Sequence, residues 1–211
     1  MDKSKIDYTL YFVTDRELMH CDSVERCVEL AVKGGASVVQ LREKDLSSRD
    51  FYETALRVHE VTKAAGVPLI INDRLDICMA AGAEGVHLGQ SDIPCKIARE
   101  ILGADKIIGV SSHNAEEAAK AQADGADYLG VGAVFATSTK TNTTPVTPEI
   151  IREVRAAVTI PFVVIGGVNE RNIAQLGGLG FNGAAVVSAV AAKDDITGAA
   201  RIMREAIEKA L

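Results

Sequence analysis

The stretch Val67-Pro68-Leu69-Ile70-Ile71-Asn72-Asp73 decides the fold of this chain. Its middle is apolar at every position, so a strand formed there has to be covered on both faces. Such strands are typical of a parallel sheet with helices packed on each side. The polar pair Asn72-Asp73 follows at the carboxyl end, where parallel sheets bind their ligands. The stretch therefore predicts an α/β fold with candidate ligand groups at the end of a strand.

Similar apolar runs recur along the chain, with a helical pattern between each run and the next. The predicted strands comprise residues 8–14, 38–42, 67–72, 85–88, 107–111, 128–132, 161–165 and 184–187. The pairs Gly35-Ala36, Gly82-Ala83 and Gly125-Ala126 each end a helix directly before a strand, which is a weak internal repeat. Strands and helices that alternate in this way predict repeated βα units.

Eight such units in 211 residues predict a TIM (β/α)8 barrel, a single domain over residues 1–211, at the compact end of that fold. The alternative is an open doubly wound sheet. Candidate ligand groups follow nearly every predicted strand. An open sheet would spread these groups along a line, whereas a closed barrel gathers them on one face. We therefore favour the barrel, and no linker or change in composition divides the chain.

The composition argues against several classes of partner. The formal net charge is -6, and no basic run compensates for it, so we expect no nucleic-acid partner. The four cysteines form no C-x-x-C pair, so a zinc or redox site has little support. With no signal peptide and no long apolar span, we expect a cytoplasmic protein without a membrane partner. The sequence leaves open whether the chain forms a homo-oligomer.

Several helix starts carry capping residues. Asp22, Ser47, Asn114 and Asn169 are the expected N-caps, because their side chains accept hydrogen bonds from backbone N–H groups. Glu and Asp three residues after some of them complete capping boxes. Thr147-Pro148 opens a further helix, since proline is well tolerated in the first turn.

The segment Gln40-Leu41-Arg42-Glu43-Lys44 carries two cations at the end of a predicted strand. Side chains alternate along a strand, so Gln40, Arg42 and Lys44 are expected on one face. Leu41 and Glu43 then lie on the other face, and the Glu43 side chain is expected to be structural. Arginine and lysine on one face suit a phosphate. The alternative is that Lys44 simply meets solvent and Arg42 pairs with Glu43.

Two carboxylates follow neighbouring strands. Asp73 ends the third strand and Asp92 follows the fourth, so both could hold one hard cation. Mg2+ usually takes one or two protein carboxylates and fills its other positions with water and substrate oxygens. The alternatives are an N-cap role for Asp92 before Ile93-Pro94 and an ion pair of Asp73 with Arg74. The cations at Arg42 and Lys44 favour the metal site.

Ser111 follows the fifth strand and is expected to donate a hydrogen bond to an anion. No motif for a nucleophilic serine surrounds it. Histidine is a common general base, but the sequence shows no obvious carboxylate to orient the ring of His87 or of His113. We therefore expect both histidines to support the core or the site residues and not to act as bases.

Two further segments suit phosphate groups. The loop Thr137-Ser138-Thr139-Lys140 follows the sixth strand and offers hydroxyl and ammonium donors, although it could also be a solvated loop. Gly166-Gly167 and Val187-Ser188 follow the seventh and eighth strands, the usual phosphate-binding corner of a barrel. One anion site then suits a metal-bound diphosphate and the other a monophosphate. This combination predicts a transferase that expels pyrophosphate.

Motifs along nearly the whole chain resemble one known family, thiamine phosphate synthase. They are Q-L-R-E-K at 40–44, I-N-D at 71–73, V-H-L-G-Q-x-D at 86–92, G-V-S at 109–111, G-A-D-Y-L-G-V-G from Gly125, T-x-T-K at 137–140 and I-G-G at 165–167. The resemblance implies a TIM barrel that joins 4-amino-2-methyl-5-(diphosphooxymethyl)pyrimidine to 4-methyl-5-(2-phosphoethyl)thiazole. The products would be thiamine phosphate and pyrophosphate.

The resemblance also implies roles for individual residues. The pyrimidine diphosphate would be bound by Gln40, Leu41, Arg42, Glu43, Lys44, Asn72, Ser111 and Lys140, with Leu41 and Glu43 contributing backbone. Of these, the catalytic residues would be Arg42, Lys44, Ser111 and Lys140. Mg2+ would be held by Asp73 and Asp92. The thiazole phosphate would be bound by Thr137, Ser138, Thr139, Gly167, Val187 and Ser188.

The reaction that the resemblance implies is dissociative: pyrophosphate leaves first, and the thiazole nitrogen then attacks the pyrimidine carbocation. The attacking nitrogen has a free lone pair, so no general base is required. Two alternatives remain from the same scaffold. One is an isomerase like thiazole tautomerase, and the other is a non-catalytic protein that binds thiamine phosphate. The cations and carboxylates argue against the isomerase, because one monophosphate needs no site for a metal and a diphosphate.

Overall fold

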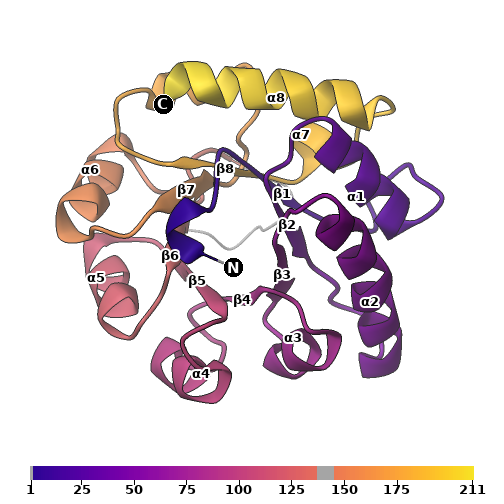
Figure 1. The fold of residues 1–211 in the computed structure, drawn as a ribbon. Coiled ribbons are helices and arrows are strands. Elements are labelled where there is room, and N and C mark those ends of the chain that lie inside the picture. Colours follow the sequence, from indigo (N-terminus) through magenta and orange to yellow (C-terminus); the bar gives the residue numbers. More distant parts are fainter. Residues whose placement is uncertain (1, 137–144) are drawn as a thin grey trace.

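A closed barrel of eight parallel strands, ordered as in the sequence, forms the centre of the molecule. The computed structural model describes residues 2–136 and 145–211. Helices surround the strands in a ring, and the last strand pairs with the first (Figure 1). The expected TIM (β/α)8 barrel is therefore confirmed, and the open sheet is excluded.

Strands alternate with helical segments around this ring. The strands are β1 (Leu10–Val13), β2 (Val38–Leu41), β3 (Leu69–Asn72), β4 (Gly85–Leu88), β5 (Ile107–Ser112), β6 (Tyr128–Gly132), β7 (Phe162–Ile165) and β8 (Gly183–Val186). The α-helices are α1 (Val24–Lys33), α2 (Ser48–Ala64), α3 (Leu75–Ala81), α4 (Cys95–Leu102), α5 (Ala115–Ala123), α6 (Pro148–Ala157), α7 (Ser188–Ala191) and α8 (Ile196–Ala210). Two 3-10 helices are η1 (Lys3–Lys5) and η2 (Ile173–Leu176). The connection from β7 to β8 thus carries η2 in place of a full α-helix.

The alternation of side chains along each strand divides the core into two layers. Outward residues such as Leu41 and Ile71 pack against the helices in one large apolar cluster. Inward residues such as Tyr11, Ile70 and Tyr128 form a second, smaller cluster inside the barrel. The strands therefore read as continuous apolar runs because both of their faces are buried.

The interior of the barrel is shaped by a glycine. Gly109 lies between His87 on β4 and Tyr128 on β6 in the register of the sheet. A Cβ atom at Gly109 would overlap the ring of Tyr128. Glycine at this position therefore gives Tyr128 the space to cross the barrel interior.

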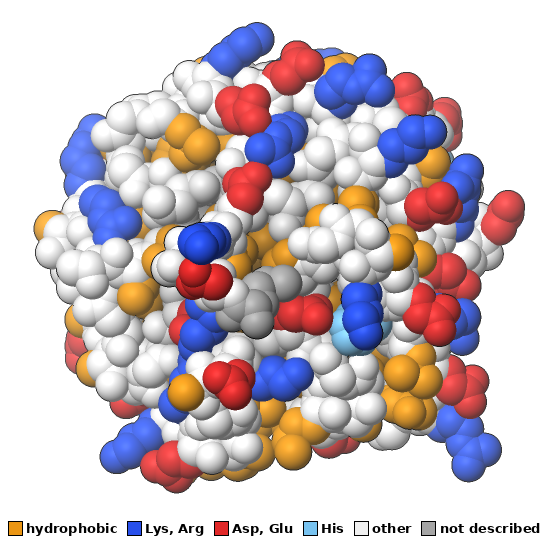
Figure 2. All heavy atoms as spheres, in the orientation of Figure 1, with side chains coloured by type: hydrophobic (Ala, Val, Ile, Leu, Met, Phe, Trp, Pro, Cys, Tyr) orange, Lys and Arg blue, Asp and Glu red, His pale blue; other side chains and the backbone are white. Residues whose placement is uncertain are grey.

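The amino-terminal segment covers the face of the barrel at which the strands begin. Lys3 in η1 forms an ion pair with Asp127, at 2.7 Å, and donates to the carbonyl of Ala104, also at 2.7 Å. Both partners lie just before strands β5 and β6. On the face that Figure 2 shows, basic and acidic side chains are interspersed and form no continuous basic patch. Across residues 2–136 and 145–211, no helix is both long and apolar enough to cross a membrane.

Three of the expected helix starts are confirmed. The Ser47 hydroxyl accepts from the Asp50 backbone N–H at 3.2 Å, which caps α2, and donates to the Asp50 carboxylate at 2.7 Å. The Asn114 side chain accepts from the Glu117 N–H at 2.8 Å. Thr147 is the N-cap of α6, with proline at the next position.

The caps expected at Asp22 and Asn169 are wrong. Ser23 caps α1 instead, and its hydroxyl accepts from the Arg26 N–H at 3.2 Å. Aspartate and serine cap equally well, so a one-residue shift in the helix start decided between them. Asn169 lies in the turn before η2, whose first flanking residue is Asn172. The side chains of both asparagines donate to the Gly167 carbonyl and so hold that turn together.

Gly109→Ala should reduce the free energy of unfolding by about 1–3 kcal/mol, because the added methyl group overlaps Tyr128 and overpacks the barrel interior. Urea denaturation followed by circular dichroism measures this loss. Gly130→Ala is the matched control on the neighbouring strand, where the nearest atom to the new Cβ is 3.1 Å away and belongs to His87. Equal stability of Gly109→Ala and the wild type would contradict the tight fit.

Candidate active site

A cavity of about 570 Å³ opens at the carboxyl ends of the strands. Its volume lies in the range of small-molecule sites, about 300–1,000 Å³. Every strand contributes to its lining. The residues predicted from the sequence that line it are Gln40, Arg42, Lys44, Asn72, Asp73, Asp92, Ser111, Gly167, Val187 and Ser188. Barrel closure therefore brings together groups that are far apart in the chain.

Arg42 and Lys44, which follow β2, form one wall of the cavity, and we refer to it as the basic wall. The guanidinium of Arg42 lies 3.6 Å from the Asp15 carboxylate, which is too long for a hydrogen bond. Glu43 instead forms a two-point ion pair with Arg16, at 2.8 and 3.1 Å. The alternative that Arg42 pairs with Glu43 is thus wrong, because their side chains leave the backbone on opposite sides. Arg42 and Lys44 keep donors for an anionic ligand.

Leu41 and Glu43 point their side chains away from the cavity. Leu41 is fully buried in the layer between strands and helices, and the Glu43 side chain is only 4% exposed beside Arg16. Gln40 faces inward, and its side-chain amide donates to the Tyr11 hydroxyl at 2.8 Å. Any contribution of Leu41 and Glu43 to ligand binding is therefore limited to their backbone.

The two predicted metal ligands, Asp73 and Asp92, line the same part of the cavity. Asp73 has a φ of 64°, a left-handed conformation that is uncommon outside glycine. Burial and the adjacent Asp92 carboxyl raise the pKa of Asp73 to about 6, although Lys44 opposes this shift. The charged form of Asp73 is thus costly unless a cation lies nearby. Strained backbone of this kind is typical of functional positions.

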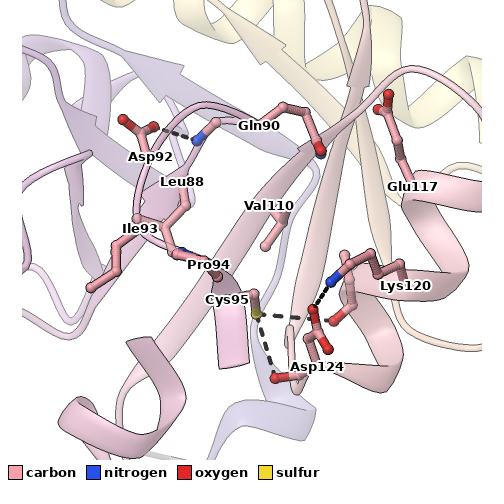
Figure 3. Close-up of a pocket in the computed structure, with 12 residues that line it drawn as sticks. Leu88, Gln90, Asp92, Ile93, Pro94, Cys95, Val110, Glu117, Lys120 and Asp124 are labelled. Carbon is pink, nitrogen blue, oxygen red and sulfur yellow. Dashed lines mark hydrogen bonds and ion pairs between the residues drawn. The ribbon is translucent and has the colours of Figure 1, made fainter. Parts of the chain in front are cut away.

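Neither alternative for these carboxylates holds. Arg74 pairs with Asp76 at 2.6 Å and not with Asp73. Asp92 does not cap α4, which begins at Cys95. Its carboxylate instead accepts from the Gly89 N–H at 2.6 Å and so closes the loop after β4 (Figure 3).

The donor set fits Mg2+ better than zinc. Within residues 2–136 and 145–211, there is no group of three or more His, Cys, Asp or Glu side chains that could hold a metal. Zinc sites need three or four such protein ligands. Mg2+ needs one or two carboxylates and takes its other ligands from water and from substrate phosphates. Asp73 and Asp92 beside a basic wall match that requirement.

Both histidines of interest line the cavity. His87 contacts the Tyr128 hydroxyl through Nδ1, at 2.9 Å, and the Ser111 hydroxyl through Nε2, at 3.0 Å. His113 contacts the Glu117 carboxylate through Nδ1, at 2.8 Å. The expectation that no carboxylate orients His113 is therefore wrong. The spacing of four residues onto α5 could have identified Glu117 from the sequence.

The corner between β7 and β8 is built from backbone. Gly166 and Gly167 have φ of 97° and 65°, and a Cβ at Gly167 would overlap the Ala136 carbonyl. The side chains of Asn169 and Asn172 both donate to the Gly167 carbonyl, at 3.2 and 2.9 Å. Because a trans peptide is planar, these bonds direct the next N–H group to the opposite side. The turn thus holds backbone donors in fixed directions.

Val187 and Ser188 complete this corner at the start of α7. The expected loop residues Thr137, Ser138, Thr139 and Lys140 lie outside the part of the chain that the structure describes. Their roles therefore stay predictions.

A second, smaller cavity of about 190 Å³ lies behind the loop after β4, between this loop and α5 (Figure 3). Lys120 forms an ion pair with Asp124 in its wall. The Cys95 thiol contacts backbone carbonyls, and burial raises its pKa to about 11, so it is a poor nucleophile. Gln90 donates to the Ser111 carbonyl at 2.6 Å and ties the loop to β5. This region therefore supports the loop that carries Asp92.

Tyr11 and Tyr128 lie on the floor of the main cavity and were not identified from the sequence. Their positions within apolar strands suggested only core packing. A buried tyrosine hydroxyl nevertheless needs a hydrogen-bond partner, which is the signal that could have identified them.

Comparison with known proteins supports one family. The sequence profile of the family described as thiamine monophosphate synthase matches residues 10–190. A thiamine-phosphate synthase from Clostridium botulinum is 50% identical over 207 residues, which cover 98% of this chain and 97% of that protein. Another, from Ruminiclostridium cellulolyticum, is 53% identical over 203 residues, covering 96% and 97%.

Solved structures agree with this result. The thiamine phosphate pyrophosphorylase from Pyrococcus furiosus is similar with a TM-score of 0.88 and 35% identity, and the match covers 98% of each chain. An N-acetylmannosamine-6-phosphate 2-epimerase from Clostridium perfringens has a TM-score of 0.69 at 18% identity. The latter likeness concerns the fold alone.

Mg2+ should raise the melting temperature at neutral pH and lose this effect as the pH falls through about 6, because Asp73 must be ionised to bind a cation. Asp73→Asn should abolish the Mg2+ effect, and asparagine tolerates the positive φ. Differential scanning fluorimetry with MgCl2, against NaCl of equal ionic strength, measures the shift. Asp76→Asn, which removes the partner of Arg74, is the control and should keep it.

Without metal, Asp73→Asn should increase the stability of the protein. A carboxylate whose pKa is raised in the folded state destabilises that state when it is ionised. Asp73→Asn should therefore raise the melting temperature at about pH 8 and have little effect at about pH 4. If Mg2+ stabilised this variant as much as the wild type, Asp73 would not be a metal ligand.

Proposed function

Since this chain belongs to the thiamine monophosphate synthase family of enzymes, we propose that it joins 4-amino-2-methyl-5-(diphosphooxymethyl)pyrimidine to 4-methyl-5-(2-phosphoethyl)thiazole. The products are thiamine phosphate and pyrophosphate. The observation that carries this proposal is a single cavity with a basic wall, a carboxylate pair and a backbone-built corner. Its partners are small phosphorylated molecules. All four cysteines are free thiols, which is usual in a reducing compartment, so we place the reaction in the cytoplasm.

The basic wall binds the diphosphate of the pyrimidine substrate. Arg42 offers a planar fork of donors, and Lys44 offers a point charge, and both are suited to phosphate oxygens. Ser111 adds a hydroxyl donor from the opposite side of the barrel, and Asn72 adds an amide. Lys140 is the further cation in this proposal, supplied by the loop after β6.

Asp73 and Asp92 would hold Mg2+ beside the diphosphate. A bound ion would supply positive charge that neutralises the charge developing on the departing phosphate oxygens. The raised pKa of Asp73 supports this assignment, since two adjacent carboxylates are most easily kept ionised by a shared cation. The Gly89 N–H holds the Asp92 carboxylate in place.

The corner between β7 and β8 binds the phosphate of the thiazole substrate. Backbone N–H groups around Gly167, Val187 and Ser188 act as donors there, and a Cβ at Gly167 would block the close approach. Thr137, Ser138 and Thr139 supply hydroxyl donors in the same proposal. The phosphate groups of the two substrates are thus bound at different places in one cavity, and their reacting ends meet between these places.

The reaction is dissociative. The bond between the methylene carbon and the diphosphate oxygen breaks, and both of its electrons leave with pyrophosphate. The amino group of the pyrimidine stabilises the resulting cation, and the thiazole nitrogen forms the new C–N bond with its lone pair. Arg42, Lys44, Ser111 and Lys140 are the catalytic residues, because they stabilise charge on the leaving group. No proton has to be removed from the nucleophile.

Purified protein mixed with both substrates and Mg2+ should release pyrophosphate and thiamine phosphate in equal amounts. An isomerase of the thiazole phosphate would instead convert that substrate alone and release no pyrophosphate. A binding protein would bind thiamine phosphate without turnover. Either result, with a correctly folded chain, would contradict the proposal.

Asp92→Ala should reduce kcat by about 100-fold or more, because a group that supports charge development in the transition state is lost. Binding of the thiazole phosphate, measured by titration calorimetry, should change little, since its corner lies elsewhere in the cavity. Asp105→Ala is the matched control, because Asp105 is an exposed carboxylate that precedes β5. Equal losses of turnover and of thiazole phosphate binding would count against a metal role.

A further inference from the structure

A continuous chain of hydrogen bonds crosses the floor of the cavity from Gln40 on β2 to Ser111 on β5. Gln40 Nε2 lies 2.8 Å from the Tyr11 hydroxyl, which lies 2.6 Å from the Tyr128 hydroxyl. Tyr128 lies 2.9 Å from His87 Nδ1, and His87 Nε2 lies 3.0 Å from the Ser111 hydroxyl. Strands β2 and β5 stand on opposite sides of the barrel (Figure 1). We refer to these five residues as the hydrogen-bond chain.

We propose that the hydrogen-bond chain is a directional positioning device, which holds His87 as its Nε2–H tautomer and thereby turns the Ser111 hydroxyl proton toward the ligand. His87, Tyr128 and Tyr11 are then positioning residues that act on the reaction through Ser111. The inference rests on the proposed function for the identity of the ligand, the departing diphosphate. The direction of the chain itself does not depend on that identity.

The burial of the two tyrosines restricts the hydrogen-bond chain to one direction at a time. Tyr11 is 1% exposed and Tyr128 is fully buried, so neither hydroxyl can rely on bulk water for a partner. Burial also raises the pKa of both hydroxyls far above its ordinary value, so each stays neutral. A neutral hydroxyl has one proton to donate. Each tyrosine can therefore pass on one hydrogen bond in one direction.

The side-chain amide of Gln40 sets that direction. Its nitrogen donates to the Tyr11 oxygen, so Tyr11 uses its own proton to donate to Tyr128. Tyr128 then donates to His87 Nδ1, which must carry a lone pair. A neutral imidazole with a lone pair on Nδ1 carries its proton on Nε2, and this proton is donated to Ser111. The Ser111 proton is left to point away from His87 and into the cavity.

The opposite direction would give the site the wrong polarity. If His87 carried its proton on Nδ1, Ser111 would donate to Nε2 and present a lone pair to the ligand. A lone pair repels a diphosphate, whereas an O–H donor stabilises it. The chain therefore converts Ser111 into a dedicated donor for an anion.

The barrel provides space for the hydrogen-bond chain. A Cβ at Gly109 would overlap the Tyr128 ring, and a Cβ at Gly130 would lie 3.1 Å from His87. The His87 and Tyr128 rings pack at a centroid distance of 5.6 Å, and those of Tyr11 and Tyr128 at 5.7 Å. The glycines thus allow rings large enough to span the interior between opposite strands.

Nitrogen-15 NMR of histidine-labelled protein, without substrates, tests the direction. His87→Gln identifies the His87 signals by their loss. The wild type should show a neutral Nε2–H ring. Gln40→Glu replaces the donor by an acceptor-only group, so Tyr11 should donate to Glu and the chain should reverse to the Nδ1–H tautomer. Tyr8→Phe is the control, because Tyr8 packs on Tyr128 but is not a member of the chain.

An Nδ1–H ring in the wild type, or an unchanged ring in Gln40→Glu, would overturn the proposal. The wild-type result decides even if Gln40→Glu fails to fold. Product formation by a protein with an Nδ1–H ring would leave the proposed function intact and would exclude the proposed direction of the hydrogen-bond chain. If the wild type has an Nε2–H ring, Gln40→Glu has the Nδ1–H tautomer, and the protein shows no synthase turnover, the hydrogen-bond chain would be supported and the proposed function excluded.

Kinetics give a second readout. Tyr128→Phe keeps the ring but removes the donor to His87, so kcat should fall about 10- to 100-fold, the effect of losing one hydrogen bond to a charged group. The KM for the thiazole phosphate should be unchanged. In a Ser111→Ala background, Tyr128→Phe should have no further effect on kcat, because the chain acts through the Ser111 hydroxyl. Independent, multiplicative losses would show that Tyr128 is merely structural and would overturn the proposal.

Discussion

The pairing of β8 with β1 is the constraint on which the rest of the molecule depends. The register Leu10↔Ala184, Tyr11↔Ala185 and Phe12↔Val186 closes the sheet into a ring. Closure places the carboxyl ends of all strands around one opening, so the residues after β2 face those after β5 across the cavity. In an open sheet the same residues would be spread along an edge. The basic wall, the carboxylate pair and the corner between β7 and β8 line one cavity because of this single pairing.

Positive charge is concentrated locally at one wall of the cavity, although the whole chain is negatively charged. The formal net charge is -6, yet the cations Arg42 and Lys44 line one wall of the cavity. Asp15 stays 3.6 Å from Arg42, and Glu43 is occupied by Arg16. The acidic pair of Asp73 and Asp92 then makes room for a cation beside an anion. The metal-bound diphosphate that we propose as ligand would satisfy both sets of charges at once.

Much of the fold and of the candidate site could be predicted from the sequence, because strand periodicity and the polar residues at strand ends are local patterns. The barrel, the inward direction of Gln40 and the outward direction of Leu41 and Glu43 all follow from them. Pairings between distant residues do not follow from such local patterns. Tyr11 and Tyr128 are 117 residues apart, and only barrel closure brings their hydroxyls together. The helix cap at Ser23 in place of Asp22 depends on a shift of one residue, which propensity alone does not resolve.

We propose that one cavity binds a metal-bound diphosphate and, apart from it, a second phosphate. A crystal structure with Mg2+, pyrophosphate and thiamine phosphate would test this arrangement. Pyrophosphate should lie against Arg42 and Lys44, with the metal between it and Asp73 and Asp92, and the phosphate of thiamine phosphate should lie at Gly167 and Ser188. A structure with pyrophosphate at the β7–β8 corner, or with the metal away from both aspartates, would contradict the proposed arrangement.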